Sequence, residues 1–306
     1  MPGRKNISDF IRFQCELFDQ LPALRFQRRD RRREISFARL YELAGSLAGA
    51  LLQRGLRPGD RVCIMGETSP DWVLAYFAAQ LAGGVDVAVE PHADAARVTT
   101  IMQRMNARIV FCQRESVAAD LARPGHGLFP IALSWQQAPK GAGYLRLADL
   151  ADARRRILTS QILRRLPGHE RLPDDPASIL FKRKDQGLTR PRGIVLTQRN
   201  IISNIMSFST ALPVESRDSL LLSLPLWHSS GRLALYFALV TGRPLCLSDA
   251  TDFVEDLNAW KPTLAIATPE TLTDLFRSIR EGHAGENRLL ILARRMHLAL
   301  CRFYYR

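Results

Sequence analysis

The chain has 306 residues, of which 46% are hydrophobic and 24% charged, and its formal net charge is +13. The length suggests about two domains or lobes, and the hydrophobic content is sufficient for a buried core. A chain that is disordered throughout is therefore excluded. No apolar run reaches the roughly 20 residues of a membrane span, and the N-terminus lacks the apolar stretch of a signal peptide, so a cytoplasmic location is the default expectation.

The positive charge is divided among separate clusters, at 28–33, 154–156, 182–184 and 294–295. Such a charge suits nucleic acid, an anionic membrane surface, or anionic substrates such as nucleotides and coenzyme A. No aromatic residues interleave with the cations, and no helix-turn-helix or RNA-recognition pattern is present, so we expect no specific nucleic-acid partner.

The cysteines are scattered, without a CxxC pair or a histidine at ligand spacing. They are Cys15, Cys63, Cys112, Cys246 and Cys301. We therefore expect neither a disulfide framework nor a zinc site, and we interpret Cys63 and Cys112, which lie in apolar runs, as buried thiols.

The first predicted element is an amphipathic helix over residues 8–21. Its expected apolar face consists of Phe10, Phe13, Leu17 and Leu21. A short strand at 24–26 and a charged turn at 28–33 follow. Ser36 then caps a helix whose apolar residues recur at helical spacing, and Gly55 ends it.

Strands and helices alternate in the next part of the chain. Apolar runs at 61–65, 85–89 and 107–112 predict strands, and Ser69 and Asp94 cap the helices between them. Strands with near-continuous apolar runs, separated by helices, are typical of a parallel sheet with helices on both faces. We therefore expect a doubly wound, mostly parallel α/β fold with these strands in one sheet.

We divide the chain into a first α/β lobe over residues 1–160 and a second α/β lobe over 161–306, which ends in a basic helix. A further strand at 131–135 and a helix carrying Arg154–Arg156 are expected in the first lobe. Beyond the hairpin described next, the predicted elements are a helix over 198–212, a helix over 233–240, a strand over 244–247 and a helix opened by Thr268 and Pro269.

Residues 177–200 predict a strand, a polar loop and a second strand. In the loop, Gly187 and Gly193 free the backbone to turn its N–H groups towards an anion, Thr189 offers a hydroxyl, and the cations add charge. Such a loop suits phosphate. From the loop alone, a solvated basic hairpin remains the alternative, because a glycine-spaced motif is weak evidence by itself. Thr197 is the expected cap of the helix that follows.

Phe181, the tetrapeptide 190–193 and residues 195–200 resemble the phosphate-loop signature of the adenylate-forming enzymes, the acyl-CoA synthetase and luciferase-like superfamily. The hydroxyl-rich run of that signature is replaced here by residues 182–189, which are longer and mostly charged. The resemblance implies the doubly wound fold of the family's N-terminal domain. It also implies that phosphate is contacted by Gly187, Thr189, Arg192 and Gly193.

A second motif lies at residues 224–231, which resemble the family's Pro-Leu-aromatic-His-x-x-Gly turn before an apolar helix. In the family this turn borders the acyl pocket, so the resemblance implies that Trp227, His228 and Gly231 bind substrate. From the residues alone, His228 could equally be a helix cap or a core residue.

The basic tail at 287–306 is most similar to the long-chain fatty-acid–CoA ligase branch. The implied reaction joins a fatty acid to ATP as an acyl-adenylate and then forms the coenzyme A thioester, with ATP, Mg²⁺ and coenzyme A as cofactors. The later family motifs, for adenine, magnesium, ribose and the adenylation lysine, have no counterpart in these residues. We therefore expect only the N-terminal part of such a ligase, with impaired catalysis, and we assign neither a catalytic residue nor a metal ligand.

Two alternatives stay open. The chain could be a non-catalytic remnant or scaffold that binds lipid or nucleotide, or a fragment completed by a separately encoded C-terminal polypeptide. Leucines and arginines alternate over residues 288–306, which favours peripheral contact with an anionic membrane. An amphipathic helix folded back on its own domain would show the same pattern.

Overall fold

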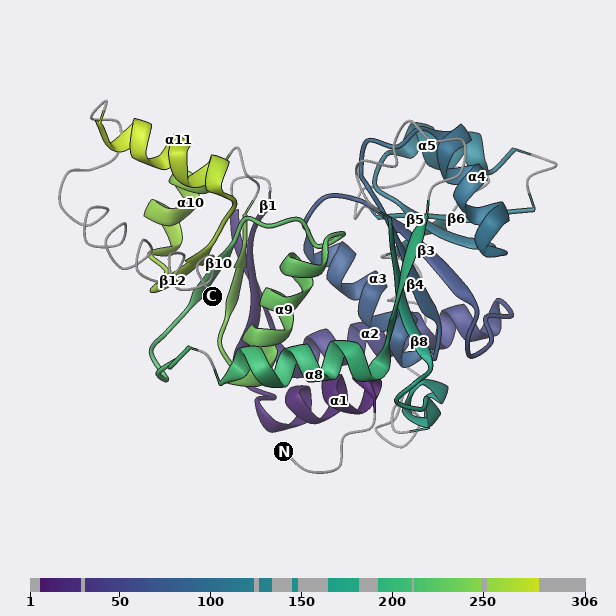
Figure 1. Ribbon diagram of the computed structural model, residues 1–306, viewed down its shortest axis with the longest axis horizontal. Helices are drawn as coiled ribbons and strands as arrows, with labels where there is room; N and C mark the ends of the chain where they lie inside the picture. Colours follow the sequence, from purple (N-terminus) through teal and green to yellow (C-terminus); the bar gives the residue numbers. More distant parts are fainter. Residues whose placement is uncertain are drawn as a thin grey trace.

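The structure is a computed structural model. It describes residues 6–28, 31–123, 127–133, 145–147, 165–181, 192–210, 212–248 and 252–280. These residues form two sheets, with one group of helices between the sheets and a further pair of helices outside each sheet (Figure 1). The α/β class expected from the sequence is confirmed.

The larger sheet has seven strands in the order β7-β6-β5-β3-β4-β8-β9. They are β3 (Arg61–Met65), β4 (Val85–Val89), β5 (Ile109–Cys112), β6 (Phe129–Ala132), β7 (Leu145–Arg146), β8 (Pro176–Phe181) and β9 (Gly193–Thr197). β3, β4 and β5 are parallel strands of one sheet, as predicted, but β3 lies in the middle, so their spatial order is not the order of the sequence that we expected. β8 continues the sheet parallel to β4, and β9 pairs antiparallel with β8 as the expected hairpin.

The smaller sheet has five strands in the order β12-β10-β11-β1-β2. They are β1 (Pro22–Arg28), β2 (Arg31–Ser36), β10 (Leu220–Leu222), β11 (Leu245–Leu247) and β12 (Leu264–Ile266). All neighbours are parallel except β1 and β2. Each sheet thus takes strands from both sides of residue 160, and the division into two lobes at that residue stays a prediction.

The helices form three groups. Those between the sheets are α1 (Ile7–Leu17), α2 (Phe37–Gln53), α3 (Pro70–Leu81), α8 (Gln198–Ser209) and α9 (Ser229–Thr241), and they share one buried cluster with both sheets. The outer helices are α4 (Ala95–Met105) and α5 (Glu115–Leu121) on the larger sheet, and α10 (Phe253–Trp260) and α11 (Pro269–Arg280) on the smaller one. A short 3₁₀ helix, η1 (Pro167–Glu170), precedes β8.

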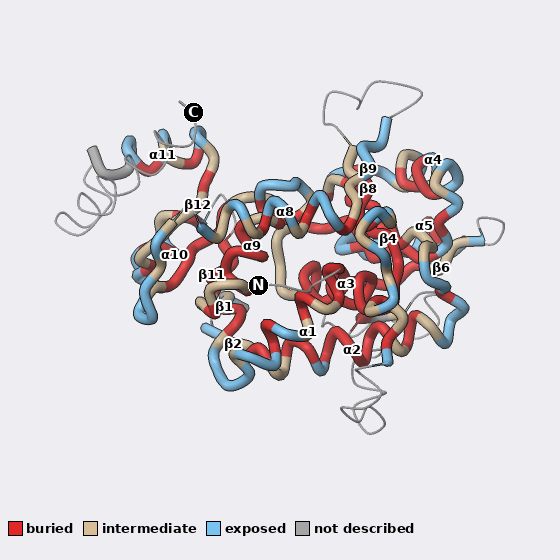
Figure 2. Tube along the Cα trace, turned by 60° about the horizontal axis from the view of Figure 1, so that its bottom comes forward, coloured by how far each residue is buried: buried red, intermediate tan, exposed pale blue. Residues whose placement is uncertain are grey.

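The pleat of the strands explains this layering. In β3, Val62 and Ile64 face the central helices, whereas Cys63 and Met65 face α4 and α5, because successive side chains point to opposite faces. Every residue of α3 after Pro70 is buried, as expected for a helix enclosed on all sides (Figure 2). Cys63 and Cys112 are both buried, as predicted, and burial raises the pKa of the Cys112 thiol to about 12.

The predicted helix starts are confirmed at their caps. The side chains of Ser36, Ser69, Asp94 and Thr197 each accept the backbone N–H of the residue three positions later. Thr197 and Asn200 form a reciprocal capping box at α8. Each such cap contributes roughly 1 kcal/mol. These local bonds explain why the sequence alone locates the starts of the helices.

Two predictions near the N-terminus are wrong. α1 ends at Leu17, and its buried face consists of Ile7, Phe10, Ile11 and Cys15, whereas Phe13, Leu17 and Leu21 are 42%, 54% and 41% exposed. The predicted apolar face and the observed buried face both fit the period of a helix. Contacts with distant elements decide which of the two faces is buried. Residues 31–33, expected in a turn, belong to β2, whose exposed arginines lie on an edge strand, where charge discourages pairing with another chain. The predictions at Arg154–Arg156 and 287–306 lie outside the described residues.

Candidate functional site

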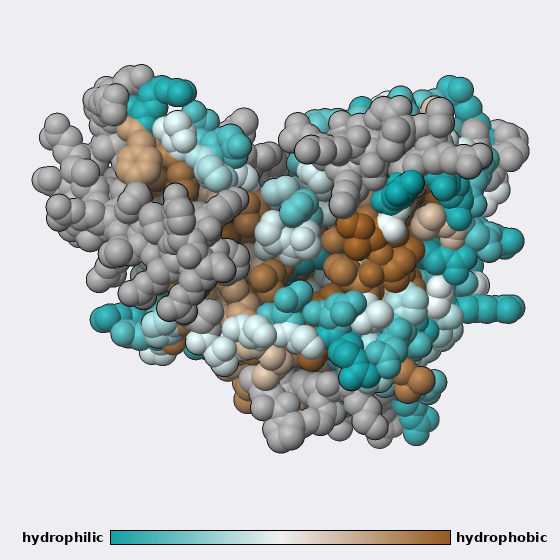
Figure 3. Space-filling view, in the orientation of Figure 1, coloured by the Kyte–Doolittle hydropathy of each residue, from teal (hydrophilic) through white to brown (hydrophobic). Residues whose placement is uncertain are grey.

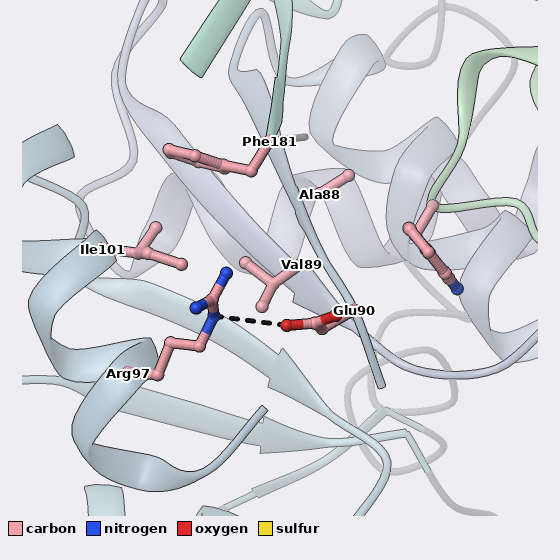
Figure 4. Close-up of a pocket in the computed structure, with 7 residues that line it drawn as sticks. Ala88, Val89, Glu90, Arg97, Ile101 and Phe181 are labelled. Atoms are coloured by element: carbon pink, nitrogen blue, oxygen red, sulfur yellow. Dashed lines mark ion pairs between the residues drawn. The ribbon is translucent and has the colours of Figure 1, made fainter. Parts of the chain in front are cut away.

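A pocket opens at the carboxyl ends of β4 and β8 (Figure 4). It is lined by Ala88, Val89, Glu90, Arg97, Ile101, Phe181 and Trp227, and its empty volume, including the open mouth, is about 270 Å³. In open parallel sheets, ligands bind outside the carboxyl ends of the strands, so the location is a typical one for a ligand. In the orientation of Figure 1, apolar side chains gather in the central part of the visible surface (Figure 3).

The pocket combines an apolar wall with one ion pair. Arg97 Nε lies 3.2 Å from Glu90 Oε1, and each side chain is 20% exposed. Opposite charges at this separation largely neutralise each other, so the pair adds polarity to the rim without a strong net charge. The rest of the lining is aliphatic or aromatic, which suits the hydrocarbon part of a ligand.

The two sequence motifs meet at this pocket. Phe181, at the end of β8, belongs to the phosphate-loop signature, and Trp227 belongs to the turn before α9. Both side chains line the pocket, although they come from different elements. The structure therefore brings together one aromatic residue from each motif, and it adds Glu90, Arg97 and Ile101, which the sequence did not indicate.

The predicted phosphate ligands are only partly described. Arg192 and Gly193 are exposed at the start of β9, whereas Gly187 and Thr189 lie outside the described residues. Gly193 pairs with Phe181 across the hairpin. A Cβ atom at Gly193 would lie 2.7 Å from Ile179 Cγ2 and 3.4 Å from the Phe181 ring. A side chain at Gly193 would therefore require Ile179 to move.

The second motif forms a tight turn. The His228 N–H donates to the Pro225 carbonyl at 3.1 Å, and a Cβ atom on Gly231 would collide with that same carbonyl. Gly231 therefore lets the turn close against α9. This is a packing role, whereas contact between Gly231 and substrate stays a prediction.

His228 is the N-cap of α9 and is exposed. Its Nδ1 lies 2.8 Å from Ser230 Oγ, and its ring centroid lies 6.3 Å from that of Trp227, with the planes nearly perpendicular. Although the residue as a whole is exposed, its ring is partly shielded from water, and this desolvation, followed by the positive charge of Arg232, lowers the pKa of His228. The imidazole is therefore neutral at pH 7, and it can both donate and accept a hydrogen bond.

A buried polar cluster lies directly behind the turn. Arg232 Nη2 lies 2.8 Å from Asp86 Oδ2, and Arg232 Nη1 donates to Ser178 Oγ at 2.5 Å. Ser178 Oγ in turn donates to Asp86 Oδ2 at 3.1 Å, and Gln80 Nε2 donates to Asp86 Oδ1 at 3.2 Å. Desolvation raises the pKa of the Asp86 carboxyl, while Arg232 and the hydrogen bonds from Ser178 and Gln80 oppose that shift. The cluster joins α3, β4, β8 and α9.

Sequence reasoning missed this cluster, although one signal was available. Asp86 interrupts an otherwise apolar strand, and Arg232 stands among the buried residues of α9. A charged residue within a buried run requires a partner of opposite charge, because an isolated buried charge is very costly. That rule predicts that Asp86 has a partner of opposite charge, but it does not identify which residue the partner is.

In the described part of the chain, no group of three or more histidine, cysteine, aspartate or glutamate residues is placed to hold a metal ion. Within the same ranges, no helix is long and apolar enough to cross a membrane.

Comparison with known proteins gives a consistent result. The family described as AMP-binding enzyme matches residues 11–306. The chain is 26% identical over 250 residues to the long-chain-fatty-acid–CoA ligase FadD15 of Mycobacterium bovis, a match that covers 79% of this chain and 40% of that protein. It is 27% identical over 292 residues to the mitochondrial medium-chain acyl-CoA ligase ACSF2 of Mus musculus, covering 81% and 46%. The chain thus spans less than half the length of these relatives.

Solved structures share the fold. The inhibitor-bound N-terminal domain of FACL13 from Mycobacterium tuberculosis has a TM-score of 0.68 at 22% identity, over 88% of this chain and 64% of that chain. Coronafacic acid ligase from Pectobacterium brasiliense has a TM-score of 0.74 at 17% identity, over 92% and 53%. The N-terminal subdomain of Klebsiella oxytoca NpsA, in complex with 3-hydroxybenzoyl-AMSN, has a TM-score of 0.62 at 20% identity, over 85% and 59%. Since the family match extends over residues 11–306, the chain belongs to the AMP-binding enzyme family.

Proposed function

We propose that the chain forms the N-terminal part of an AMP-forming fatty-acid–CoA ligase. The reaction would activate a fatty acid with ATP to an acyl-adenylate and then transfer the acyl group to coenzyme A. The observation that carries the proposal is the pocket that Phe181 and Trp227 line together, because each belongs to a different motif. The names of the relatives, which are long-chain and medium-chain ligases, support a fatty acid as the substrate class.

The proposed roles of the site residues follow from their location. Trp227, His228 and Gly231 would border the acyl group, with Trp227 supplying apolar surface at the pocket wall. The phosphates of ATP would be contacted by Gly187, Thr189, Arg192 and Gly193. Of these, Arg192 is an exposed cation beside the hairpin that carries Phe181.

The chain alone would be a poor catalyst. Adenylation places a carboxylate on the α-phosphorus among anions that repel it, so it needs a metal and fixed cations as pyrophosphate leaves. The later motifs that supply the magnesium site and the lysine in the family are not among these residues. Their loss would cost several kcal/mol, roughly a thousandfold in rate. Mg²⁺ and coenzyme A would act where residues that carry those later motifs are also present, in the same chain or in a complementing polypeptide.

Calorimetry with a non-hydrolysable acyl-adenylate analogue, hexadecanoyl-sulfamoyl-adenosine, tests the proposed function. We expect saturable binding that is tighter than that of hexadecanoate or AMP alone, since the analogue presents both halves of the intermediate to adjacent subsites. Acetyl-sulfamoyl-adenosine is the matched control for the acyl chain and should bind more weakly. Absence of saturable binding, or equal binding of the two analogues, would contradict a fatty acyl site.

A second candidate is a peripheral scaffold on the cytoplasmic side of an anionic membrane. It is favoured by the sequence of the tail, where an apolar stripe alternates with arginines. The members are Arg288, Leu289, Leu290, Leu292, Arg294, Arg295, Met296, Leu300, Arg302, Phe303 and Arg306. The whole chain should sediment together with anionic liposomes, and the bound fraction should fall as the salt concentration rises. Truncation after Asn287 should abolish this binding. Equal sedimentation of the folded truncated chain would exclude the tail as the anchor.

A further inference from the structure

We propose that Thr68 is a positioning residue for Trp227 and His228, with Arg232 as its partner, because the two side chains bind the N–H and the C=O of the same residue, Leu226. Residues 224–228 are called the Trp-His turn below. The inference rests on the proposed function in one respect, namely that Trp227 and His228 border the acyl group. The geometry itself is independent of that function.

Thr68 holds the Trp-His turn through both functions of its hydroxyl. The group lies in the loop between β3 and α3, and it donates to the Leu224 carbonyl at 3.2 Å. It also accepts the Leu226 N–H at 3.1 Å. One hydroxyl thus bridges two backbone groups that lie more than 150 residues further along the chain. A bridge with fixed donor and acceptor directions sets the position and the orientation of the turn.

Arg232 holds the other polar group of Leu226. Its Nε donates to the Leu226 carbonyl at 3.0 Å, while its Nη2 and Nη1 reach Asp86 and Ser178. The guanidinium is planar, so these three directions are fixed together. The Leu226 carbonyl is therefore tied to strands β4 and β8, and β8 ends in Phe181 at the pocket.

Leu226 is fully buried, and side chains from outside the turn bind both its N–H and its C=O. Because Leu226 directly precedes Trp227, these two bonds determine the direction in which the chain enters Trp227 and His228. The turn is thereby aligned with the larger sheet, although it leads into α9. Thr68 and Arg232 are thus expected to set the distance between the wall formed by Trp227 and that formed by Phe181.

The neighbour of Thr68 provides a matched control. Ser69 Oγ accepts the Trp72 N–H at 3.2 Å and caps α3. Thr68 and Ser69 are both half-buried hydroxyl residues in the same loop, and Ser69 accepts hydrogen bonds from the first turn of α3. Loss of either hydroxyl should lower stability, but only loss of the Thr68 hydroxyl should move the Trp-His turn.

The test uses Thr68→Val, which keeps the shape of the side chain, Thr68→Ser, which keeps the hydroxyl, and Ser69→Ala. The readout is the indole ¹H–¹⁵N resonance of Trp227, identified by its loss in Trp227→Phe. We expect Thr68→Val to shift this resonance, Thr68→Ser to restore it, and Ser69→Ala to lower the melting temperature without shifting it. An unmoved resonance in folded Thr68→Val, or an equal shift in Ser69→Ala, would overturn the proposal.

A second variant covers the case in which Thr68→Val does not fold. Arg232→Lys keeps a positive charge near Asp86, but a single ammonium group cannot hold both Asp86 and the Leu226 carbonyl in the geometry of a guanidinium. It should shift the same resonance, and an unshifted resonance would again overturn the proposal. Binding of hexadecanoyl-sulfamoyl-adenosine should weaken about tenfold in Thr68→Val and recover in Thr68→Ser. A tenfold change in affinity corresponds to the contribution of about one hydrogen bond. If the unaltered chain does not bind the analogue, the proposed function fails, while the resonance still decides the role of Thr68.

Discussion

Arg232 Nη2 lies 2.8 Å from Asp86 Oδ2 in the interior, where the two side chains are 5% and 0% exposed. The guanidinium carbon also lies 5.2 Å from the centroid of the Trp72 ring and 4.8 Å from that of Tyr76. One positive charge is therefore surrounded by a carboxylate and two aromatic faces, which replace the water that it would otherwise bind. This relationship joins α9 to β4 behind the pocket.

Removal of one partner of this pair should be strongly destabilising. We expect Asp86→Asn to lower the free energy of unfolding by about 3–5 kcal/mol, because the Arg232 charge stays buried without a counter-ion. The double variant Asp86→Leu with Arg232→Met should recover most of that loss. Urea unfolding of the single and double variants measures both effects.

The control for this experiment is an exposed pair. Arg199 Nε lies 2.9 Å from Asp174 Oδ1, with side chains 60% and 78% exposed, so Asp174→Asn should change stability far less. A loss in Asp174→Asn as large as that in Asp86→Asn would contradict the special role of the buried pair. So would a double variant that is no more stable than Asp86→Asn.

His228 should make stability depend on pH in a defined direction. Its pKa in the folded chain lies below the ordinary value of 6.5, through partial burial and then through Arg232. As the pH falls below about 6.5, the unfolded chain therefore binds the proton first, and stability declines until the lower folded pKa is reached. At pH values well above 6.5, His228 is neutral in both the folded and the unfolded chain, so it does not contribute to the change of stability with pH.

Denaturant midpoints between pH 5 and pH 8 check this sign. The unaltered chain should lose more stability on acidification than His228→Gln, and the difference removes the contributions of the other histidines. Parallel curves for the two proteins would contradict the lowered pKa, as would an NMR titration of His228 with a midpoint above 6.5.

Gly231 should tolerate no side chain. Its Cβ would collide with the Pro225 carbonyl, so Gly231→Ala must displace the turn or the start of α9. Overpacking of this kind costs about 1–3 kcal/mol, and we expect a lower melting temperature together with a shifted Trp227 indole resonance. Ser229→Ala, at an exposed neighbouring position, is the control and should leave both unchanged. Normal stability of Gly231→Ala would show that the turn is looser than described.

The isolated chain should not carry out adenylation. We expect no fatty-acid-dependent release of pyrophosphate from ATP above a control without protein, because the metal site and the lysine of the family are not among these residues. A coupled phosphate assay with hexadecanoate measures it. Clear release that disappears in Arg192→Ala would show that the residues present suffice for the first step.

The local features of the fold could be read from the sequence. Ser36, Ser69, Asp94 and Thr197 cap helices through bonds that span only three residues, so their pattern is visible along the chain. The apolar runs of β3, β4 and β5 likewise predict buried parallel strands. These signals depend on neighbours in the sequence and not on the rest of the fold.

The remaining features depend on contacts between distant segments. β1 and β2 join a sheet whose other strands begin at residue 220, and no local pattern indicates that partner. Thr68 looks like an ordinary loop residue until the turn at 224–226 is placed against it. Asp86 requires a partner, but several cations could have supplied it, and only the packing of α9 against β4 selects Arg232.

We propose above all that the two motifs build one acyl site. Calorimetry with hexadecanoyl-sulfamoyl-adenosine should compare the unaltered chain with Phe181→Ala, Trp227→Ala and the double variant, with Leu172→Ala, which is 63% exposed and outside the pocket, as control. We expect each single variant to weaken binding about tenfold and the control to leave it unchanged. The loss of affinity in the double variant should be smaller than the product of the two single losses, because both rings contact the same ligand. Unchanged affinity in both single variants, or a double variant whose loss is the full product, would contradict a shared site.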